Sequence, residues 1–247
     1  MNIIVCSSRG KSLRSLNKRE DTVVRVVPGG RIGQLVDIAK EELNKILTKP
    51  NPKFVYFVAG LPDTTTKIYE EFWMNDELHA YEEVIFSNTP ENIIGIINSA
   101  AQDILAENAI PIFSTIVPCH LSIWNHTRLS QHKTSHLLHY KNYDLMQEQQ
   151  LETIREINSY ILHINSQNRV ATPKLAKPVY YRRGNSWRFR FGKLADGVHA
   201  TDKLKKVWHK TVNKILNRNL LDRDLEAILE QHQTSESEAD SDEEADQ

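Results

Sequence analysis

The fold is decided early in the chain, by the stretch VVRVVPGGRI at residues 23–32. Residues 23–27 are mostly valine, which favours a buried strand, and the Pro-Gly-Gly that follows ends the strand in a turn. After the turn, apolar residues recur at the three- and four-residue spacing of a helix with one buried face. These are Ile32, Leu35, Ile38, Ala39, Leu43, Ile46 and Leu47. The stretch therefore predicts a strand, a glycine turn and a helix in succession.

The same alternation continues on both sides of this unit. Residues 3–5 form a short apolar run before a polar turn, residues 54–58 (FVYFV) form another that ends at Gly60, and residues 110–116 form a fourth that ends at Pro118. A helix is predicted over residues 90–108, with one apolar face made of Ile93, Ile97, Ala101, Ile104 and Leu105. Apolar strands separated by amphipathic helices predict an α/β fold, a three-layer α/β/α sandwich with a mainly parallel, flavodoxin-like sheet.

The second half of the chain is less regular. Residues 119–145 read as a polar, His-rich insertion with a short helix, and helices are predicted over residues 148–164 and 202–216. We predict one domain over residues 1–219, a terminal helix at 220–233 and a disordered acidic tail at 234–247. The tail holds seven acidic and no basic residues, which leaves 31 basic against 25 acidic residues before it. Ser235, Ser237 and Ser241 suit acidophilic kinases, although such a tail also serves simply to keep a protein soluble.

Composition narrows the protein class. An apolar fraction of 40% suffices to build a core. No window approaches the roughly 20 apolar residues of a membrane span, and the N-terminus lacks the basic flank and cleavage site of a signal peptide. Only Cys6 and Cys119 are present, so a disulfide framework is not expected. We expect an intracellular protein, cytoplasmic or nuclear and not secreted, with no membrane span.

Polar and glycine residues follow each predicted strand: residues 7–8, 28–30, 60–63 and 117–118. In open parallel sheets, ligands bind beyond the carboxyl ends of the strands. These four turns therefore mark the expected site.

Asp196-Gly197-Val198-His199, just before the predicted helix at 202, is the strongest local motif. Its carboxylate is spaced to orient the imidazole, which then serves as a base for a hydroxyl at a neighbouring strand end. Ser7 and Ser8 stand at such an end. Taken alone, the motif also fits a surface turn that caps the next helix.

The order of these turns resembles the SGNH (GDSL-like) hydrolase family across most of residues 2–217. The resemblance places Ser8 on the family's nucleophile, Gly29 or Gly30 on a backbone donor of the oxyanion hole, and Gly60 in the third block. Asp196 and His199 match the last block, Asp-x-x-His. The resemblance implies a serine esterase or acyl hydrolase that acts on a small ester and needs no cofactor or metal. The Ser8 N–H would also serve the oxyanion hole.

Two residues depart from the family pattern. Ser7 replaces the aspartate before the nucleophile, which affects turn geometry more than chemistry. Pro62 replaces the asparagine whose side chain donates to the oxyanion, and proline has no donor. Loss of one such donor typically costs roughly 2.7–4 kcal/mol, about a hundred- to a thousand-fold in rate. The sequence thus predicts an intact triad with a weakened oxyanion hole, or a descendant that is no longer catalytic.

Two other residue clusters suggest other functions. His132, His136 and His139 share the spacing of one helical face, as zinc ligands do, but no cysteine or carboxylate completes the set, which suits a polar insertion. Arg182, Arg183, Arg188 and Arg190 alternate with aromatic residues, which fits either a nucleic-acid surface or a plain edge hairpin with one buried face. The alternative function is therefore a nucleic-acid- or protein-binding module. Domains of this family also occur in retrotransposons and some invertebrate viruses, and the unsecreted, lysine-rich chain suits such a source.

Overall fold

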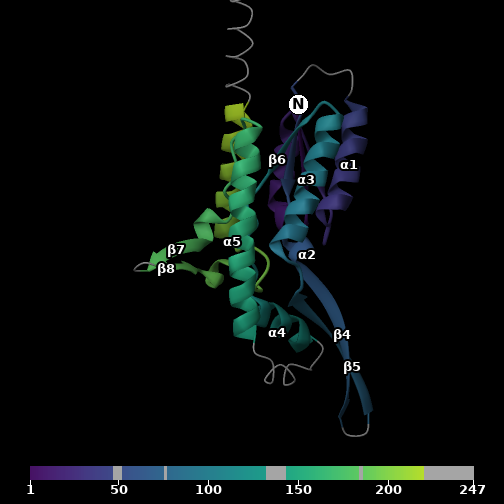
Figure 1. The fold of residues 1–247 in the computed structure, drawn as a ribbon, viewed down its shortest axis with the longest axis vertical. Helices are drawn as coiled ribbons and strands as arrows, with labels where there is room; N and C mark the ends of the chain where they lie inside the picture. Colours follow the sequence, from purple (N-terminus) through teal and green to yellow (C-terminus); the bar gives the residue numbers. More distant parts are fainter. Residues whose placement is uncertain (47–51, 75–76, 132–142, 184–185, 220–247) are drawn as a thin grey trace, which may run out of the picture.

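A computed structural model of the chain describes residues 1–46, 52–74, 77–131, 143–183 and 186–219. Its centre is a parallel sheet in the order β2-β1-β3-β6 (Figure 1). The strands are β1 (Asn2–Cys6), β2 (Thr22–Val26), β3 (Phe54–Val58) and β6 (Ile110–Phe113). All four runs predicted as strands form strands, and the predicted parallel α/β class is confirmed.

The sheet is buried on both faces, which explains why its strands are continuously apolar. Neighbouring strands pair in register, with Ile3 beside Val55 and Ile4 beside Tyr56. Alternate residues point to opposite faces. Ile3 and Val55 belong to one core cluster, whereas Ile4 and Tyr56 belong to the other. Two separate cores, one on each face, make the three layers.

Three helices cover one face: α1 (Ile32–Lys45), α3 (Pro90–Ala106) and α5 (Tyr143–Gln167). α1 begins at Ile32, directly after the glycine turn at residues 28–30, as the sequence predicts. In α3 the predicted apolar face packs inward except for Leu105, which is 48% exposed. α5 is longer than the predicted 148–164 because it starts at the buried Tyr143, whose hydroxyl donates to Glu83 (2.6 Å).

The other face is covered by the 3-10 helix η1 (Ser8–Lys18) and by helix 202–219. Trp208 is the large anchor of this layer, fully buried, with its indole N–H donating to the Leu175 carbonyl (2.9 Å). The helix at 202 was predicted to end at 216 and continues to 219, the last described residue.

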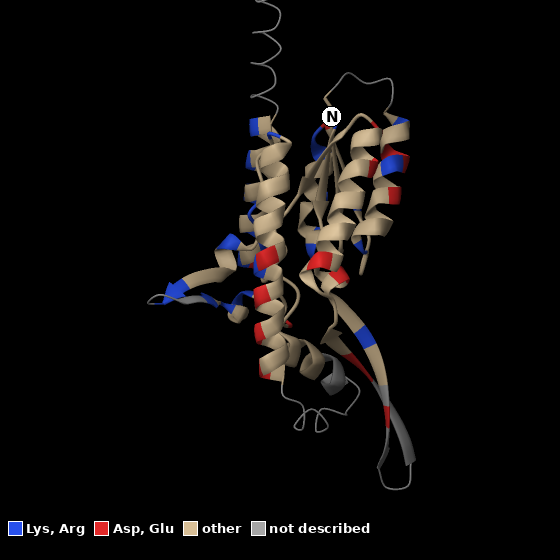
Figure 2. Cartoon of the chain, viewed as in Figure 1, with Lys and Arg blue, Asp and Glu red and all other residues tan. Residues whose placement is uncertain are grey.

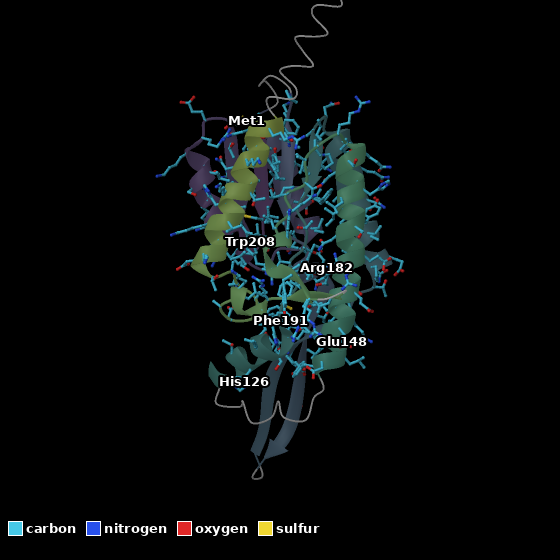
Figure 3. The ribbon with its side chains drawn as sticks, turned by 90° about the vertical axis from the view of Figure 1, so that its left-hand side faces the viewer. Met1, His126, Glu148, Arg182, Phe191 and Trp208 are labelled. Carbon is cyan, nitrogen blue, oxygen red and sulfur yellow. The ribbon has the colours of Figure 1, made fainter. Side chains whose placement is uncertain are left out.

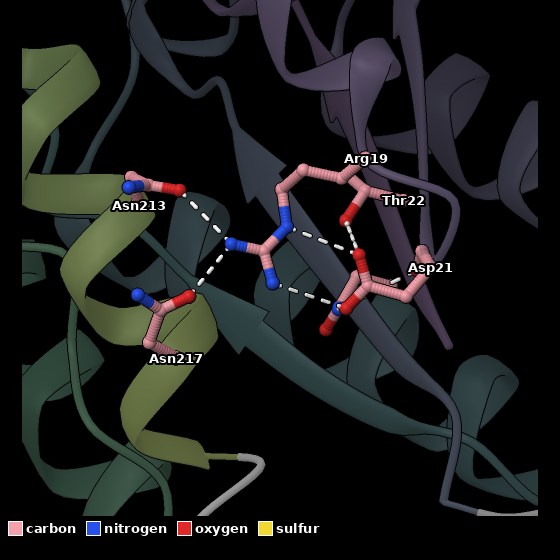
Figure 4. A network of polar contacts seen from close by, with 6 residues as sticks. Arg19, Asp21, Thr22, Asn213 and Asn217 are labelled. Atoms are coloured by element: carbon pink, nitrogen blue, oxygen red, sulfur yellow. Dashed lines mark hydrogen bonds and ion pairs between the residues drawn. The ribbon is translucent and has the colours of Figure 1, made fainter.

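A polar network fastens helix 202–219 to the sheet near its amino edge (Figure 4). Arg19 makes two hydrogen bonds to the Asp21 carboxylate (3.0 and 3.1 Å) and donates to the side-chain oxygens of Asn213 and Asn217 (3.0 and 2.6 Å). The hydrogen bond from Arg19 lowers the pKa of Asp21, and the same bond raises the pKa of Arg19. The network links residues almost 200 positions apart in sequence, and so fixes the direction of the helix that follows His199.

Two antiparallel hairpins lie outside the main sheet. The longer, β4 (Thr65–Met74) with β5 (Glu77–Phe86), was not predicted from sequence and projects from the carboxyl end of the sheet, just after the short helix α2 (Leu61–Thr64) (Figure 1). Its base is held by Asn125 of α4 (Leu121–Gln131), whose side chain bonds both the N–H and the C=O of Val84 (2.9 and 2.8 Å). The shorter hairpin is β7 (Tyr180–Arg183) with β8 (Ser186–Phe189), flanked by the short 3-10 helices η3 (Lys177–Val179) and η4 (Phe191–Lys193).

Several predictions fall on other parts of the chain. The terminal helix at 220–233, the acidic tail at 234–247 and His132, His136 and His139 lie outside the described residues. Within the described part, no helix has both the length and the apolar character needed to cross a bilayer.

Candidate active site

The predicted turns meet at one edge of the sheet. β1 lies in the middle, between β2 and β3, so Ser8 after β1 is flanked by the turn at residues 28–30 and by the turn at Gly60. All strands are parallel, and their carboxyl ends therefore gather at this edge. The turns that the sequence marks as the expected site thus lie side by side at this edge of the sheet.

Ser8 is presented at the start of η1, half-buried. The preceding Ser7 is held by its backbone N–H, which donates to the Val58 carbonyl (3.2 Å), and Ser7 in turn accepts from the Gly10 N–H (2.9 Å). Gly10 lies directly against Cys6, where an added Cβ would stand 2.3 Å from the Cys6 Cβ. Only glycine lets the chain fold back this tightly over β1, and this turn leaves the Ser8 hydroxyl displayed at the strand end.

His199 lies between Ser8 and Asp196. Its Nε2 is 3.3 Å from the Ser8 Oγ, and its Nδ1 is 2.6 Å from a carboxylate oxygen of Asp196. The other Asp196 oxygen accepts from the backbone N–H groups of Val198 (3.0 Å) and His199 (2.6 Å). The structure thus brings together the three residues expected to be catalytic, across a separation of 191 positions in sequence.

The Asp196 carboxylate is ionised at neutral pH. Partial burial raises its pKa, but the hydrogen bonds from the His199 ring and from the backbone outweigh burial and hold the pKa below its usual value. A carboxylate in this state orients the imidazole and stabilises it when it carries a proton.

The loop that carries His199 is docked on α4 through Gly197. The Gly197 carbonyl accepts from the His120 N–H (2.7 Å), and its φ is +79°, in the left-handed region. An added Cβ would come within 2.8 Å of the His120 carbonyl oxygen and of the Trp124 N. The loop is closed on its other side by a backbone bond from Ala195 to His199 (2.7 Å). The predicted His-rich insertion, for which a short helix was expected, therefore supports the Asp-His turn through α4.

The backbone N–H groups that are candidates for the oxyanion hole differ in whether they already have a hydrogen-bond acceptor. The Gly30 N–H already donates to the Val27 carbonyl (3.0 Å), whereas those of Gly29 and Gly60 have no backbone acceptor within the described residues. Pro62 lies in the first turn of α2 and has no donor to offer. Asp63, next to it, is buried and accepts from the Ile32 N–H with both carboxylate oxygens (3.1 and 3.2 Å). Of the two glycines left open by the sequence, Gly29 is the one with its N–H available.

Arg9, beside Ser8, was not identified from the sequence. Its side chain is almost fully buried and donates to the carbonyls of Val117 and Pro118, just after β6. Burial lowers its pKa to about 10, so it remains a cation at neutral pH close to Asp196. Arg9 therefore fastens the fourth strand end to the turn that holds Ser8. No sequence signal distinguishes it from an exposed arginine in a polar turn.

The remaining predicted residues lie elsewhere. Arg182, Arg183, Arg188 and Arg190 are exposed on the β7–β8 hairpin, which Figure 2 shows as a cluster of basic residues projecting beside α5. The guanidinium of Arg190 stacks on Tyr181, 4.8 Å from the ring centre. His120 packs edge-on against Phe191 (4.3 Å between ring centres). Among the described residues, no group of three or more His, Cys, Asp or Glu side chains is arranged to hold a metal ion.

No protein-family model matches the sequence. A search of curated proteins also finds no match. Solved structures do match over nearly the whole chain. A candidate acylhydrolase from Bacteroides fragilis superposes with a TM-score of 0.57 at 12% identity, covering 89% of this chain and 87% of that one. A GDSL-like lipase from Bacteroides thetaiotaomicron gives 0.56 at 12% identity, covering 88% of each chain. A lipase/acylhydrolase from Enterococcus faecalis gives 0.50 at 13% identity, covering 88% of this chain and 96% of that one. The chain therefore has the α/β fold seen in SGNH/GDSL-like acylhydrolases.

Proposed function

We propose that this protein is a serine esterase or acyl hydrolase with Ser8 as nucleophile, His199 as base and Asp196 as the residue that orients the base. One observation carries the proposal: the His199 ring bridges the Ser8 hydroxyl (3.3 Å) and the Asp196 carboxylate (2.6 Å) at the carboxyl edge of the sheet. A hydroxyl, an imidazole and a carboxylate in this order make an activated nucleophile. The fold shared with GDSL-like lipases supports the same reading.

The reaction follows from this geometry. The Ser8 Oγ attacks the carbonyl carbon of an ester while His199 Nε2 takes the hydroxyl proton. The intermediate collapses, and His199 gives that proton to the departing alcohol, which leaves the acyl group on Ser8. Water then attacks the acyl carbon with His199 as base. The carboxylic acid is released and Ser8 regains its proton. Asp196 keeps its negative charge throughout and stabilises the imidazolium.

The negative charge on the carbonyl oxygen needs backbone donors. Ser8 is the first residue of η1, so its N–H has no acceptor within that helix. In the proposal this N–H and that of Gly29 form the oxyanion hole, with the Gly60 N–H as the third candidate donor. Pro62 leaves the hole one side-chain donor short, so we expect a slow enzyme, reduced about a hundred- to a thousand-fold.

Labelling with a fluorophosphonate probe tests the nucleophile directly, because the probe reacts only with an activated serine. We expect labelling of the wild-type protein and none of Ser8→Ala or His199→Ala. Ser15→Ala and His163→Ala, which change exposed residues away from the triad, are the matched controls and should label normally. Hydrolysis of p-nitrophenyl butyrate should follow the same pattern. Labelling that persists in Ser8→Ala would refute the assignment.

A second candidate function, binding of a polyanion such as RNA, is favoured by the exposed arginines of the β7–β8 hairpin. Phosphate contacts of this kind weaken steeply as salt rises. Filter binding of single-stranded RNA at rising salt, with Arg188→Ala/Arg190→Ala as the test variant, distinguishes this function. Binding that the double variant leaves unchanged would exclude the hairpin as the surface.

A further inference from the structure

A cavity lies apart from the triad, between α5 and the segment that leads into β7. Its volume is about 310 Å³, and Ser8, Asp196 and His199 are not among its lining residues. Figure 3 looks onto this side of the molecule, with α5 (labelled at Glu148) and the helix of Trp208 on either side of the labels for Arg182 and Phe191. The lining residues are Thr115, Arg155, Asn158, Ser159, Leu162, Lys174, Ala176, Lys177 and Tyr180.

The charge around this cavity is of one sign. Arg155 comes from α5, and Lys174 and Lys177 come from the facing segment; no carboxylate is among the lining residues. Within the described part of the chain, none of these three cations has an ion-pair partner. Glu152 and Glu156 flank Arg155 on α5 but are exposed and do not line the cavity. All three cationic side chains are exposed beside the cavity, and cations without partners around a cavity favour an anionic ligand.

Three polar side chains of the cavity wall already form hydrogen bonds with backbone groups of the protein. The Asn158 amide bonds the N–H and C=O of Ile116 (2.6 and 2.9 Å). The Ser159 hydroxyl donates to the Arg155 carbonyl (3.1 Å), and Thr115 accepts from the Ala176 N–H (2.9 Å). These groups make a rigid wall and leave few donors for a ligand.

The Tyr180 hydroxyl is the exception. It is buried and has no hydrogen-bond partner within the described residues, while its ring packs edge-on against Phe189 (5.4 Å). Burial raises the pKa of Tyr180 to about 12, although Arg155 close by partly opposes this, so the hydroxyl keeps its proton at neutral pH. A buried donor without an acceptor is costly unless a ligand supplies one. The rest of the lining, Leu162 and Ala176 with the tyrosine ring, is apolar.

We propose that this cavity binds a single-chain amphiphilic anion. A carboxylate or phosphate head lies against Arg155, Lys174 and Lys177. The Tyr180 hydroxyl is covered in the free protein, and a shift of the Tyr180 ring on binding lets the head accept from it. The apolar tail lies against Leu162 and Ala176. The proposal does not depend on the esterase activity, because the cavity and the triad share no residue.

Titration calorimetry with octanoate and with octyl phosphate tests the proposal on the full-length protein. We expect saturable binding of at least one of the two. Octan-1-ol, which has no charge, and acetate, which has no tail, should bind at least tenfold more weakly. Preference between the two anions identifies the head group. Octan-1-ol binding as tightly as both anions would overturn the proposal, and so would an absence of saturable anion binding.

Variants locate the site. Arg155→Gln and Lys177→Gln should each weaken binding about tenfold, and Tyr180→Phe, which removes only the hydroxyl, several-fold. Lys203→Gln removes the same charge from an exposed position outside the cavity and is the matched control. His199→Ala should leave anion binding unchanged, which separates this cavity from the triad. Equal weakening by Lys203→Gln, or loss of binding in His199→Ala with Arg155→Gln unaffected, would refute the assignment.

Discussion

Substitution of Gly197 by alanine should disable the proposed site while most of the fold persists. The residue has a φ of +79°, where a Cβ costs about 1–2 kcal/mol. That Cβ would also stand 2.8 Å from the His120 carbonyl oxygen and the Trp124 N, which are backbone atoms of α4 and of the residue just before it. The loop must therefore move away from α4 by several tenths of an ångström or more, and it carries His199 with it.

The effect on catalysis follows from the distances in the triad. The bond from His199 to the Ser8 Oγ is already long, at 3.3 Å, so a further shift breaks it. A misplacement of about 1 Å typically costs a hundredfold in rate. We expect kcat/KM for p-nitrophenyl butyrate to fall about a hundredfold in Gly197→Ala. The strain of about 1–2 kcal/mol corresponds to a Tm lower by roughly 2–8 °C in a domain of this size.

Gly192→Ala is the matched control, because a Cβ at that nearby glycine meets no atom within 4 Å. It should keep near-normal kcat/KM and Tm. The reasoning is wrong if Gly197→Ala loses stability but keeps kcat/KM within about twofold, since the loop would then not position His199. Equal losses in both variants would also refute it.

Four further predictions concern single residues. Asp196→Asn removes the charge that stabilises the imidazolium, and kcat should fall by about three to four orders of magnitude while the circular dichroism spectrum stays unchanged. Pro62→Asn restores the side-chain donor missing from the oxyanion hole, so kcat for p-nitrophenyl butyrate should rise; an unchanged kcat would show that the turn does not aim this position at the oxyanion. Arg9→Met leaves two buried carbonyls without their donor, and urea unfolding should show a loss of about 1–3 kcal/mol for each, against little change in the exposed control Arg14→Met. Burial raises the pKa of Asp63 to about 6, so the folded state holds this proton more tightly than the unfolded chain does. The free energy of unfolding should therefore fall by roughly 3 kcal/mol as the pH rises from about 4 to 6. Asp63→Asn should remove this decline, which urea unfolding at a series of pH values measures.

The central layer of this protein could be predicted from the amino-acid sequence alone. Continuous apolar runs such as residues 54–58 indicate strands buried on both faces, and the amphipathic helices between these runs indicate a parallel sheet covered by helices. The glycine turn at 28–30 and the helix from Ile32 follow from local preferences that act within a few residues. The resemblance to SGNH hydrolases then predicted Ser8, Asp196 and His199 as the triad, because their short motifs can be read without knowledge of contacts, and the structure brings these three residues together.

Features that depend on contacts between distant residues could not be predicted in this way. The β4–β5 hairpin contains many β-branched and aromatic residues, but its charged residues interrupt the continuous apolar runs by which the central strands were recognised. Its place in the fold depends on Asn125, which holds its base from some 40 positions away. Arg9 is buried only because two carbonyls after β6 accept from it. Local propensity acts over a few residues, whereas these features arise from contacts that exist only after the chain has folded.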